Sequence, residues 1–258
     1  MQPRADLYLD RARADSFGAA ARVYDAHRPR YPDQLIDDLL MQRPQAVLDV
    51  GAGTGIVSEQ LVAKGANVLA VEPDPRMAEV ARDKGIRVEI GTFENWDPAE
   101  RRFDLVVFGS SFHWVNPDIA LPKVHRLLTS GGRLALMWNR LSPTHPTHSD
   151  LAEIYRDYMD PGSSVFGGSP KDRVDTDRRT GRMIASITAS GFTVEERTYP
   201  RDAHYSTQQW LDFAFTHSNH LVLAAGKASE LRARLAERIG PRGVSVSGDA
   251  LLMFATRS

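Results

Sequence analysis

The fold is decided by the stretch Val47-Leu48-Asp49-Val50-Gly51-Ala52-Gly53-Thr54-Gly55, in which a short apolar run leads directly into three closely spaced glycines. The apolar run predicts a buried strand, and residues 56–65 have the pattern of a helix. Glycines at a strand-to-helix junction let the backbone turn sharply and let a ligand approach without a Cβ in the way. The stretch therefore predicts a ligand-binding loop at the carboxyl end of the first strand.

The alternation of strand and helix continues beyond this loop, from residue 46 to residue 139. Apolar runs predict strands within 46–51, 67–73, 87–92, 103–112 and 133–139, and the stretches between them predict helices within 56–65, 74–85 and 118–131. A strand–helix–strand repeat of this kind places parallel strands in one sheet with helices on its faces. We therefore expect an α/β fold.

The rest of the chain is expected to complete a single domain, residues 1–258, around the core at 46–139. Residues 16–45 predict a helical cap of two helices separated by a break at Arg28–Pro32, because proline disfavours a helical residue before it. Residues 140–190 are rich in Ser, Pro, Gly and Arg and predict an inserted lid, with a helix near 149–159 and a mobile loop over 162–181. Residues 191–258 are expected to supply further strands and helices.

Composition excludes several classes of function. Lys and Arg total 32 against 33 Asp and Glu, so no overall positive charge attracts nucleic acid or an anionic membrane. The sequence has no cysteine, which excludes disulfides, thiolate-ligated metals and a thiol nucleophile. Since no apolar run is long enough for a signal peptide or a membrane span, we expect a cytoplasmic protein without a membrane, nucleic-acid or metal partner.

An acidic residue follows the second predicted strand. Glu72 lies about twenty residues beyond Gly51, the spacing at which a carboxylate accepts the ribose hydroxyls of an adenosine. A dinucleotide-binding loop requires glycine where this chain has Ile56, which disfavours NAD or FAD as the cofactor. Asp49, at the end of the first strand, has two interpretations. It braces the amides of the glycine loop, or it reaches an amino group of the ligand.

A series of segments resembles the motifs of the class I, Rossmann-like S-adenosylmethionine-dependent methyltransferases: VLDVGAGTG (47–55), VLAVEPD (68–74), GTFENW (91–96), FDLVVFGSSFHWV (103–115) and LLTSGGRLAL (127–136). YDAHRPRYP (24–32) and FHWVN (112–116) are similar to the small-molecule branch that includes trans-aconitate methyltransferase-like enzymes. The resemblance implies a doubly wound, mostly parallel seven-stranded sheet with helices on both faces. It also implies S-adenosylmethionine as the cofactor and S-adenosylhomocysteine as its product.

The resemblance further implies which residues contact the cofactor. The glycine loop would line the methionine portion, Glu72 would bind the ribose, and Ser110 would lie beneath the sulfonium. Residues after the second and third strands would surround the adenosine, although Met77 and Phe93 are equally well interpreted as core residues. The cofactor-binding residues expected in this way are Asp49, Gly51, Gly53, Gly55, Glu72, Pro73, Asp74, Met77, Thr92, Phe93, Glu94 and Ser110.

The methyl acceptor is expected beyond the fourth strand, at the edge where doubly wound sheets bind ligands. His113 is the candidate general base, with a packed structural histidine as the alternative, and Trp114 is either pocket wall or core. Tyr24, Arg28 and Tyr31 precede the core. Aromatic faces suit a sulfonium and a guanidinium suits a carboxylate, whereas packing of the cap or a surface salt bridge would explain these residues without a ligand.

A last group of candidates lies near the C-terminus. Trp210, Phe213, His217 and His220 are spaced so that they share one face of a predicted helix. Such a face is usually core, but it could also line the acceptor pocket. Trp210 is therefore included among the candidate substrate-binding residues.

Together these features predict an enzyme, a monomer or homodimer, that methylates a small molecule at a carboxylate or hydroxyl oxygen. Two alternatives remain open: a non-catalytic S-adenosylmethionine-binding protein and a nucleic-acid methyltransferase. Methylation of base amino groups commonly uses a polar-Pro-Pro-aromatic tetrapeptide after the fourth strand, where this chain has SSFHW (110–114). Methylation at C5 of cytosine requires a cysteine nucleophile, so both forms of the second alternative are disfavoured.

Overall fold

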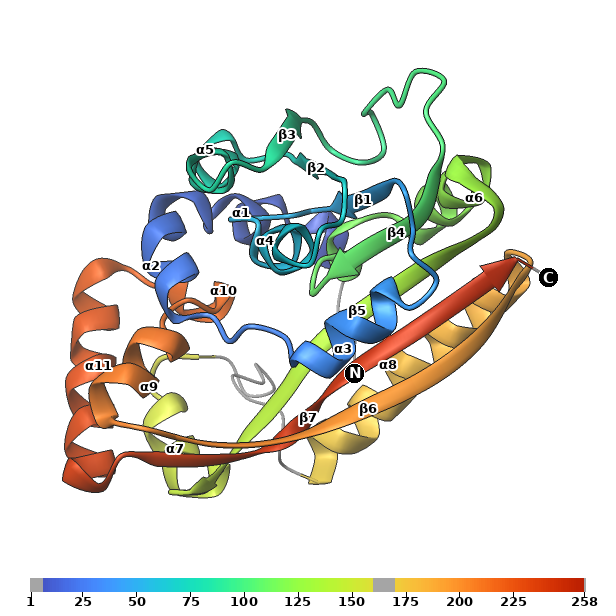
Figure 1. The fold of residues 1–258 in the computed structure, drawn as a ribbon. Coiled ribbons are helices and arrows are strands. Elements are labelled where there is room, and N and C mark those ends of the chain that lie inside the picture. The colour runs from blue at the N-terminus through green and yellow to red at the C-terminus, as the bar shows by residue number, and fades with distance from the viewer. Residues whose placement is uncertain (1–6, 160–169, 258) are drawn as a thin grey trace.

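The computed structural model describes residues 7–159 and 170–257 and contains a seven-stranded sheet in the order β3-β2-β1-β4-β5-β7-β6 (Figure 1). The strands are β1 (Val47–Val50), β2 (Val68–Glu72), β3 (Arg87–Ile90), β4 (Phe103–Gly109), β5 (Leu128–His145), β6 (Phe192–Tyr205) and β7 (Val244–Arg257). The pairs from β3 to β5 are parallel, and β7 runs antiparallel to β5 and β6. This topology confirms the predicted mostly parallel, doubly wound sheet.

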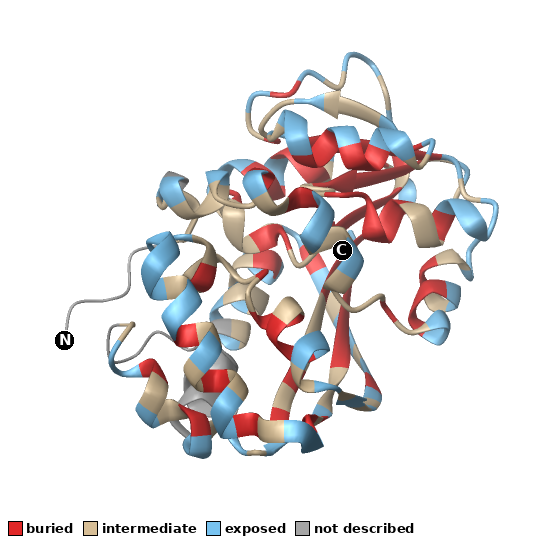
Figure 2. Cartoon of the chain, turned by 90° about the vertical axis from the view of Figure 1, so that its left-hand side faces the viewer, coloured by how far each residue is buried: buried red, intermediate tan, exposed pale blue. Residues whose placement is uncertain are grey.

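The helices cover both faces of the sheet. They are α1 (Arg11–Asp15), α2 (Ala21–His27), α3 (Asp33–Leu40), α4 (Ile56–Ala63), α5 (Pro75–Asp83), α6 (Pro117–Leu127), α7 (His148–Tyr155), α8 (Pro170–Ala189), α9 (Thr207–Ala214), α10 (Ser218–Leu221) and α11 (Ala225–Ile239), with short 3-10 turns η1 (Leu7–Leu9), η2 (Gly18–Ala20), η3 (Phe112–Trp114) and η4 (Gly240–Arg242). Val107 of β4 shares a core cluster with α3 and α4, and its neighbour Val106 shares another with α6 and α8. The sheet is therefore buried on both faces, as Figure 2 shows. Within residues 7–159 and 170–257, no helix combines the length and apolar content needed to cross a bilayer.

The last three strands extend well beyond the parallel part of the sheet. β5 has 18 residues, and β6 and β7 have 14 each. The extended ends form a separate apolar cluster with α7, α9 and α11, at the lower left of Figure 1. The sheet thus carries a second small core beside the main one.

The structure changes the expectation for the lid, residues 140–190. Residues 140–145 do not leave the sheet, because β7 pairs with β5 as far as His145. The helix predicted near 149–159 is present as α7. The loop predicted over 162–181 is wrong in its second half, since α8 begins at Pro170 and no Gly or Pro follows before Gly181. Residues 160–169 lie outside the described part of the chain.

Candidate functional site

The glycine loop joins β1 to α4 in a conformation that favours glycine. Gly51, Gly53 and Gly55 have left-handed φ angles of 63°, 58° and 77°. A Cβ on Gly51 would lie 2.7 Å from the Cβ of Ser111, and the Gly51 amide donates to the carbonyl of Val71 at 2.8 Å. The loop is therefore held against the ends of β2 and β4, with its backbone exposed to the space beyond them.

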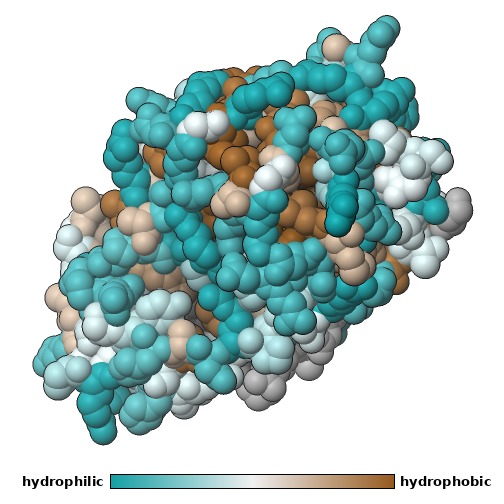
Figure 3. All heavy atoms as spheres, in the orientation of Figure 1, coloured by the Kyte–Doolittle hydropathy of each residue, from teal (hydrophilic) through white to brown (hydrophobic). Residues whose placement is uncertain are grey.

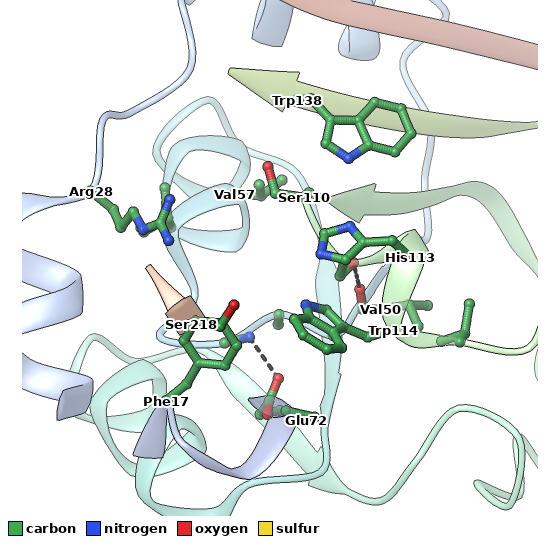
Figure 4. A pocket seen from close by; sticks show the side chains of 18 of the residues that line it. Phe17, Arg28, Val50, Val57, Glu72, Ser110, His113, Trp114, Trp138 and Ser218 are labelled. Carbon is green, nitrogen blue, oxygen red and sulfur yellow. Dashed lines mark hydrogen bonds between the residues drawn. The ribbon is translucent and has the colours of Figure 1, made fainter. Parts of the chain in front are cut away.

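Glu72 ends β2 and turns its carboxylate toward the glycine loop. One carboxylate oxygen accepts the amide of Gly53 at 2.8 Å (Figure 4). The other accepts the amide of Asp74 at 3.0 Å. The side chain is only 7% exposed, and this burial raises the pKa of its carboxyl to about 7. Because each oxygen has a second lone pair, the carboxylate retains the capacity to accept two further hydrogen bonds.

Asp49 is a second buried carboxylate at the same edge. Its Oδ2 accepts the hydroxyl of Ser58 at 2.7 Å, while Oδ1 has no hydrogen-bond partner among the described residues. Burial raises the pKa of this carboxyl to about 6. In the described part of the chain, no group of three or more His, Cys, Asp or Glu side chains has the arrangement of a metal site. The free oxygen of Asp49 is instead suited to a hydrogen-bond donor on a ligand.

The start of α5 forms the wall beyond Glu72. Asp74 accepts the amide of Arg76 and pairs with its guanidinium at 2.7 Å. The buried Met77 follows, with its Cε 3.4 Å from where a Cβ would lie on Gly53. A Cβ on Gly18 would overlap the Asp74–Arg76 pair, so the N-terminal segment crosses this wall in direct contact.

Thr92, Phe93 and Glu94 follow β3 and form the next part of the wall. The Phe93 ring packs edge-on against Phe108, with centroids 5.6 Å apart. The Glu94 carboxylate accepts the amide of Asn116 at 2.8 Å, which ties this loop to the start of α6. All three residues border the same cavity as Glu72.

The end of β4 supplies Ser110, His113 and Trp114. Ser110 has a left-handed φ of 55°, and its hydroxyl lies 3.0 Å from that of Tyr31. His113 and Trp114 lie in η3, where their ring centroids are 4.9 Å apart. Phe17 from the N-terminal segment packs edge-on against Trp114 at 5.9 Å, so the cap covers this side of the cavity.

Residues 28–32, which we call the strap, run in extended form between α2 and α3 across the carboxyl edge of the sheet. Asn139 of β5 and Arg201 of β6 donate to carbonyls of the strap at 3.1 and 2.7 Å. Gln60 of α4 accepts the amide of Tyr31 at 3.0 Å and donates to its carbonyl at 2.8 Å. The strap is therefore fastened by three separate elements, and it carries Arg28 at one end.

Arg28 has an unusual environment for a guanidinium. It donates to the carbonyl of Thr216 at 3.1 Å, lies 3.4 Å from Nε2 of His217 and stacks over the ring of Tyr24 at 4.8 Å. Its Nε has no partner, and no ion pair includes Arg28 within the described ranges. Burial and the neighbouring Arg28 charge hold the pKa of His217 well below its usual range, which leaves this histidine neutral. A guanidinium without a counter-charge beside a cavity is suited to an anionic ligand.

These elements enclose one cavity of about 650 Å³. In Figure 4 the side chains of Arg28, Glu72, His113 and Trp114 surround a common space. Figure 3, drawn in the orientation of Figure 1, shows hydrophobic residues surrounded by hydrophilic ones on this face of the molecule. The predicted site residues that line the cavity are Tyr24, Arg28, Tyr31, Asp49, Gly51, Gly53, Glu72, Pro73, Asp74, Met77, Thr92, Phe93, Glu94, Ser110, His113 and Trp114.

Two predicted residues do not line this cavity. A Cβ on Gly55 would lie 3.0 Å from the Cβ of Ala81, so this glycine allows α4 and α5 to approach each other. Trp210 is fully buried in the apolar cluster of α7, α9 and α11. It therefore has the core position that its helical spacing left open, and we exclude it from the substrate site.

Several cavity residues were missed from the sequence. They come from the extension of β5, from α8, from α9 and from the start of α10: Trp138, Asn139, Arg140, Leu141, Ser142, Thr180, Met183, Phe213, His217 and Ser218. Phe213 and His217 shared the predicted face with Trp210, so helical spacing gave a partial signal for them. The β5 residues lie at or beyond the carboxyl end of the fifth predicted strand, and this position at the ligand-binding edge of the sheet could have indicated them.

Comparisons with known proteins agree with this geometry. Residues 48–136 match the family model described as a methyltransferase domain. An uncharacterized methyltransferase of Mycobacterium tuberculosis is 40% identical over 141 residues, which cover 54% of this chain and 58% of that protein. The aligned stretch is thus less than two thirds of this relative's length.

Two further similarities extend over more of the chain. The trans-aconitate 2-methyltransferase of Mycolicibacterium gilvum is 27% identical over 185 residues, covering 69% of this chain and 70% of that protein. A solved structure from Anaeromyxobacter dehalogenans, described as a type II methyltransferase, has a TM-score of 0.57 at 18% identity and covers 89% of this chain and 97% of that one. At this identity the structural likeness shows the fold alone.

Proposed function

We propose that this chain, which belongs to the Rossmann-like S-adenosylmethionine-dependent methyltransferases, methylates a small molecule inside the cavity. The observation that carries the proposal is that one cavity is lined both by the glycine loop with Glu72 and by Arg28 with His113. Its volume of about 650 Å³ lies in the range of about 300–1,000 Å³ typical of small-molecule sites.

The residues at the Glu72 end are suited to S-adenosylmethionine. Glu72 has lone pairs left for the ribose hydroxyls, and the unpartnered oxygen of Asp49 can accept from an amino group. The glycines at 51 and 53 leave the loop without side chains toward the ligand, and Met77 and Phe93 offer apolar contact to an adenosine. When bound, this cofactor supplies a methyl group on a positively charged sulfonium. Gly55 supports the loop from behind.

The other end of the cavity is suited to an acceptor with an oxygen nucleophile. Arg28 presents a guanidinium without a counter-charge, and Tyr24, Tyr31 and Trp114 add aromatic walls. A carboxylate is already ionised at neutral pH and needs no general base, so alignment and exclusion of water by these residues would suffice. The relative named trans-aconitate 2-methyltransferase acts, by its name, on a carboxylate, which supports the same class of acceptor.

A hydroxyl acceptor would use the site differently. Its proton must be removed, and His113 is the cavity residue suited to that role. His113→Ala would then abolish turnover of a hydroxyl acceptor, whereas turnover of a carboxylate acceptor would persist. Measuring the turnover of both kinds of acceptor by the His113→Ala variant therefore distinguishes a catalytic role of His113 from a place in the pocket wall.

The proposal is tested with labelled S-adenosylmethionine and a panel of small carboxylic acids, phenols, alcohols and amines. Transfer of label to a carboxylic acid or hydroxyl compound is the expected result. Calorimetry should show binding of S-adenosylmethionine and S-adenosylhomocysteine in the micromolar range. Binding without transfer to any compound would favour the non-catalytic alternative, label on DNA or RNA would favour the nucleic-acid alternative, and binding of NADH alone would reject the family's cofactor for this chain.

A further inference from the structure

Lys123 of α6 is a buried cation that no ion pair explains. Lys123 is only 8% exposed, and although the carboxylates of Glu94 and Asp97 interact with its charge, no ion pair within the described ranges includes it. Its ammonium donates to the carbonyl of Phe93 at 2.6 Å, to that of Glu94 at 3.4 Å and to that of Trp96. All three N–H donors of this lysine are thus used on one loop, residues 92–97.

The conformation of loop 92–97 explains why a lysine fits there. The carbonyl of Thr92 accepts the amides of Asn95 and Trp96, which closes a tight turn. Without Lys123, the buried carbonyls of Phe93 and Trp96 would lose this donor, which is unfavourable, and so would the partly buried carbonyl of Glu94. The rings of Phe93 and Trp96 lie 5.1 and 5.6 Å from the ammonium and add favourable cation–π contacts. A lysine supplies three donors and a charge at one point, whereas an apolar side chain of equal length supplies neither.

Loop 92–97 is also part of the cavity wall. Thr92, Phe93 and Glu94 border the cavity on the side of Glu72, while Lys123 itself does not line it. Other contacts hold side chains of the loop, since Trp96 donates to Glu89 at 2.6 Å and Glu94 accepts from Asn116. Lys123 instead binds main-chain carbonyls of the segment that carries Phe93 and Glu94.

We propose that Lys123 is a positioning residue that holds loop 92–97 in place at the adenine end of the cofactor site. This inference rests on the proposed function, because it assigns the role of the loop to cofactor binding. It requires no contact between Lys123 and the cofactor. It predicts that removing the three donors loosens the loop even in the protein without ligand.

The test uses Lys123→Met, Lys123→Arg and, as a matched control, Lys227→Met at an exposed position of α11. S-adenosylhomocysteine affinity is measured by calorimetry, and hydrogen exchange of the amides in loop 92–97 is measured without ligand. Lys123→Met should weaken binding by about tenfold and speed exchange in the loop. Lys123→Arg should retain more of the affinity than Lys123→Met, because it keeps a positive charge and several N–H donors at this place. Lys227→Met should match the wild type.

Each outcome is decisive. A folded Lys123→Met protein with wild-type affinity and wild-type exchange in the loop would overturn the proposal. If Lys123→Met does not fold, Lys123→Gln, which loses the charge and one donor and has a shorter side chain, should also weaken binding and speed exchange in the loop, by less than Lys123→Met. Failure of the wild type to bind S-adenosylhomocysteine would contradict the proposed function instead, and unchanged hydrogen exchange in the variant would then still refute the role of Lys123 in holding the loop.

Discussion

Replacing Glu72 with glutamine removes the charge of this side chain while nearly keeping its shape. Both carboxylate oxygens already accept a main-chain amide, at 2.8 and 3.0 Å, so the side chain is held in place with one lone pair on each oxygen for a ligand. Hydrogen bonds to a charged group contribute about 1.5–3 kcal/mol, so losing the charged acceptor for the ribose should weaken S-adenosylhomocysteine binding roughly 10- to 100-fold at pH 8.

The same carboxyl predicts a pH dependence of binding. Burial raises its pKa from 4.5 to about 7, and ribose donors favour its charged form. Affinity should therefore be near its full value at pH 8, about half of that at pH 7, and about tenfold lower at pH 6 than at pH 8. The contribution of Glu72 to the free energy of unfolding changes with pH in the opposite direction to ligand affinity. Because the pKa of this carboxyl is raised in the folded state, the contribution is largest below pH 4.5 and diminishes as the pH rises to about 7.

Calorimetry with S-adenosylhomocysteine at pH 6, 7 and 8 measures the effect of Glu72→Gln on affinity and the dependence of affinity on pH. Glu72→Gln should lower the affinity at pH 8 and remove most of the dependence on pH. Glu79→Gln, an exposed acid on α5, is the matched control and should behave like the wild type. A folded Glu72→Gln protein with the affinity and pH profile of the wild type would remove Glu72 from the site.

Three other substitutions test the remaining parts of the site. Arg28→Lys should impair turnover nearly as much as Arg28→Ala, because an ammonium cannot reproduce a planar two-pronged contact. A loss of cofactor affinity would assign Arg28 to the methionine carboxylate, and a raised acceptor KM would assign it to the acceptor. Full activity of both variants would assign Arg28 to neither. Gly51→Ala should lower the free energy of unfolding by about 1–2 kcal/mol in urea titrations and weaken cofactor binding, because φ is 63° there. Trp210→Ala should cost about 3–5 kcal/mol of stability but leave cofactor affinity unchanged in the folded protein, and weaker binding would contradict its core position.

The cofactor half of the fold could be predicted from the sequence because its geometry is local. The end of β1, the glycine loop and the start of α4 lie within a few residues of one another, and the glycines at 51 and 53 permit the positive φ angles found there. The position of Glu72 follows from the parallel pairing of β1 and β2, which brings both strand ends to one edge. Gly55 shows the limit of this reasoning, since its conformation was predictable but its contact with Ala81 was not.

The proposed acceptor half depends on contacts between segments far apart in the chain. Helical spacing showed that Trp210 and Phe213 share a face of α9, but it did not show that the cluster with α7 and α11 covers Trp210 while Phe213 reaches the cavity. Likewise, the sequence around Asn139 and Arg140 indicates that the fifth strand ends there. Pairing with β7, more than a hundred residues later in the sequence, carries β5 on to His145.

This division bears on how the acceptor should be sought. The methyltransferase match covers residues 48–136 and therefore includes the glycine loop, Glu72 and His113, but not Arg28 or His217. Similarity over this core does not extend to the proposed acceptor end, which α2, the strap, the β5 extension, α8, α9 and the start of α10 line. The acceptor is therefore better inferred from the chemistry of those elements than from the relatives. Among the described residues of those elements that line the cavity, Arg28 carries a guanidinium that no ion pair includes, beside a histidine that burial keeps neutral, so carboxylates come first in the screen.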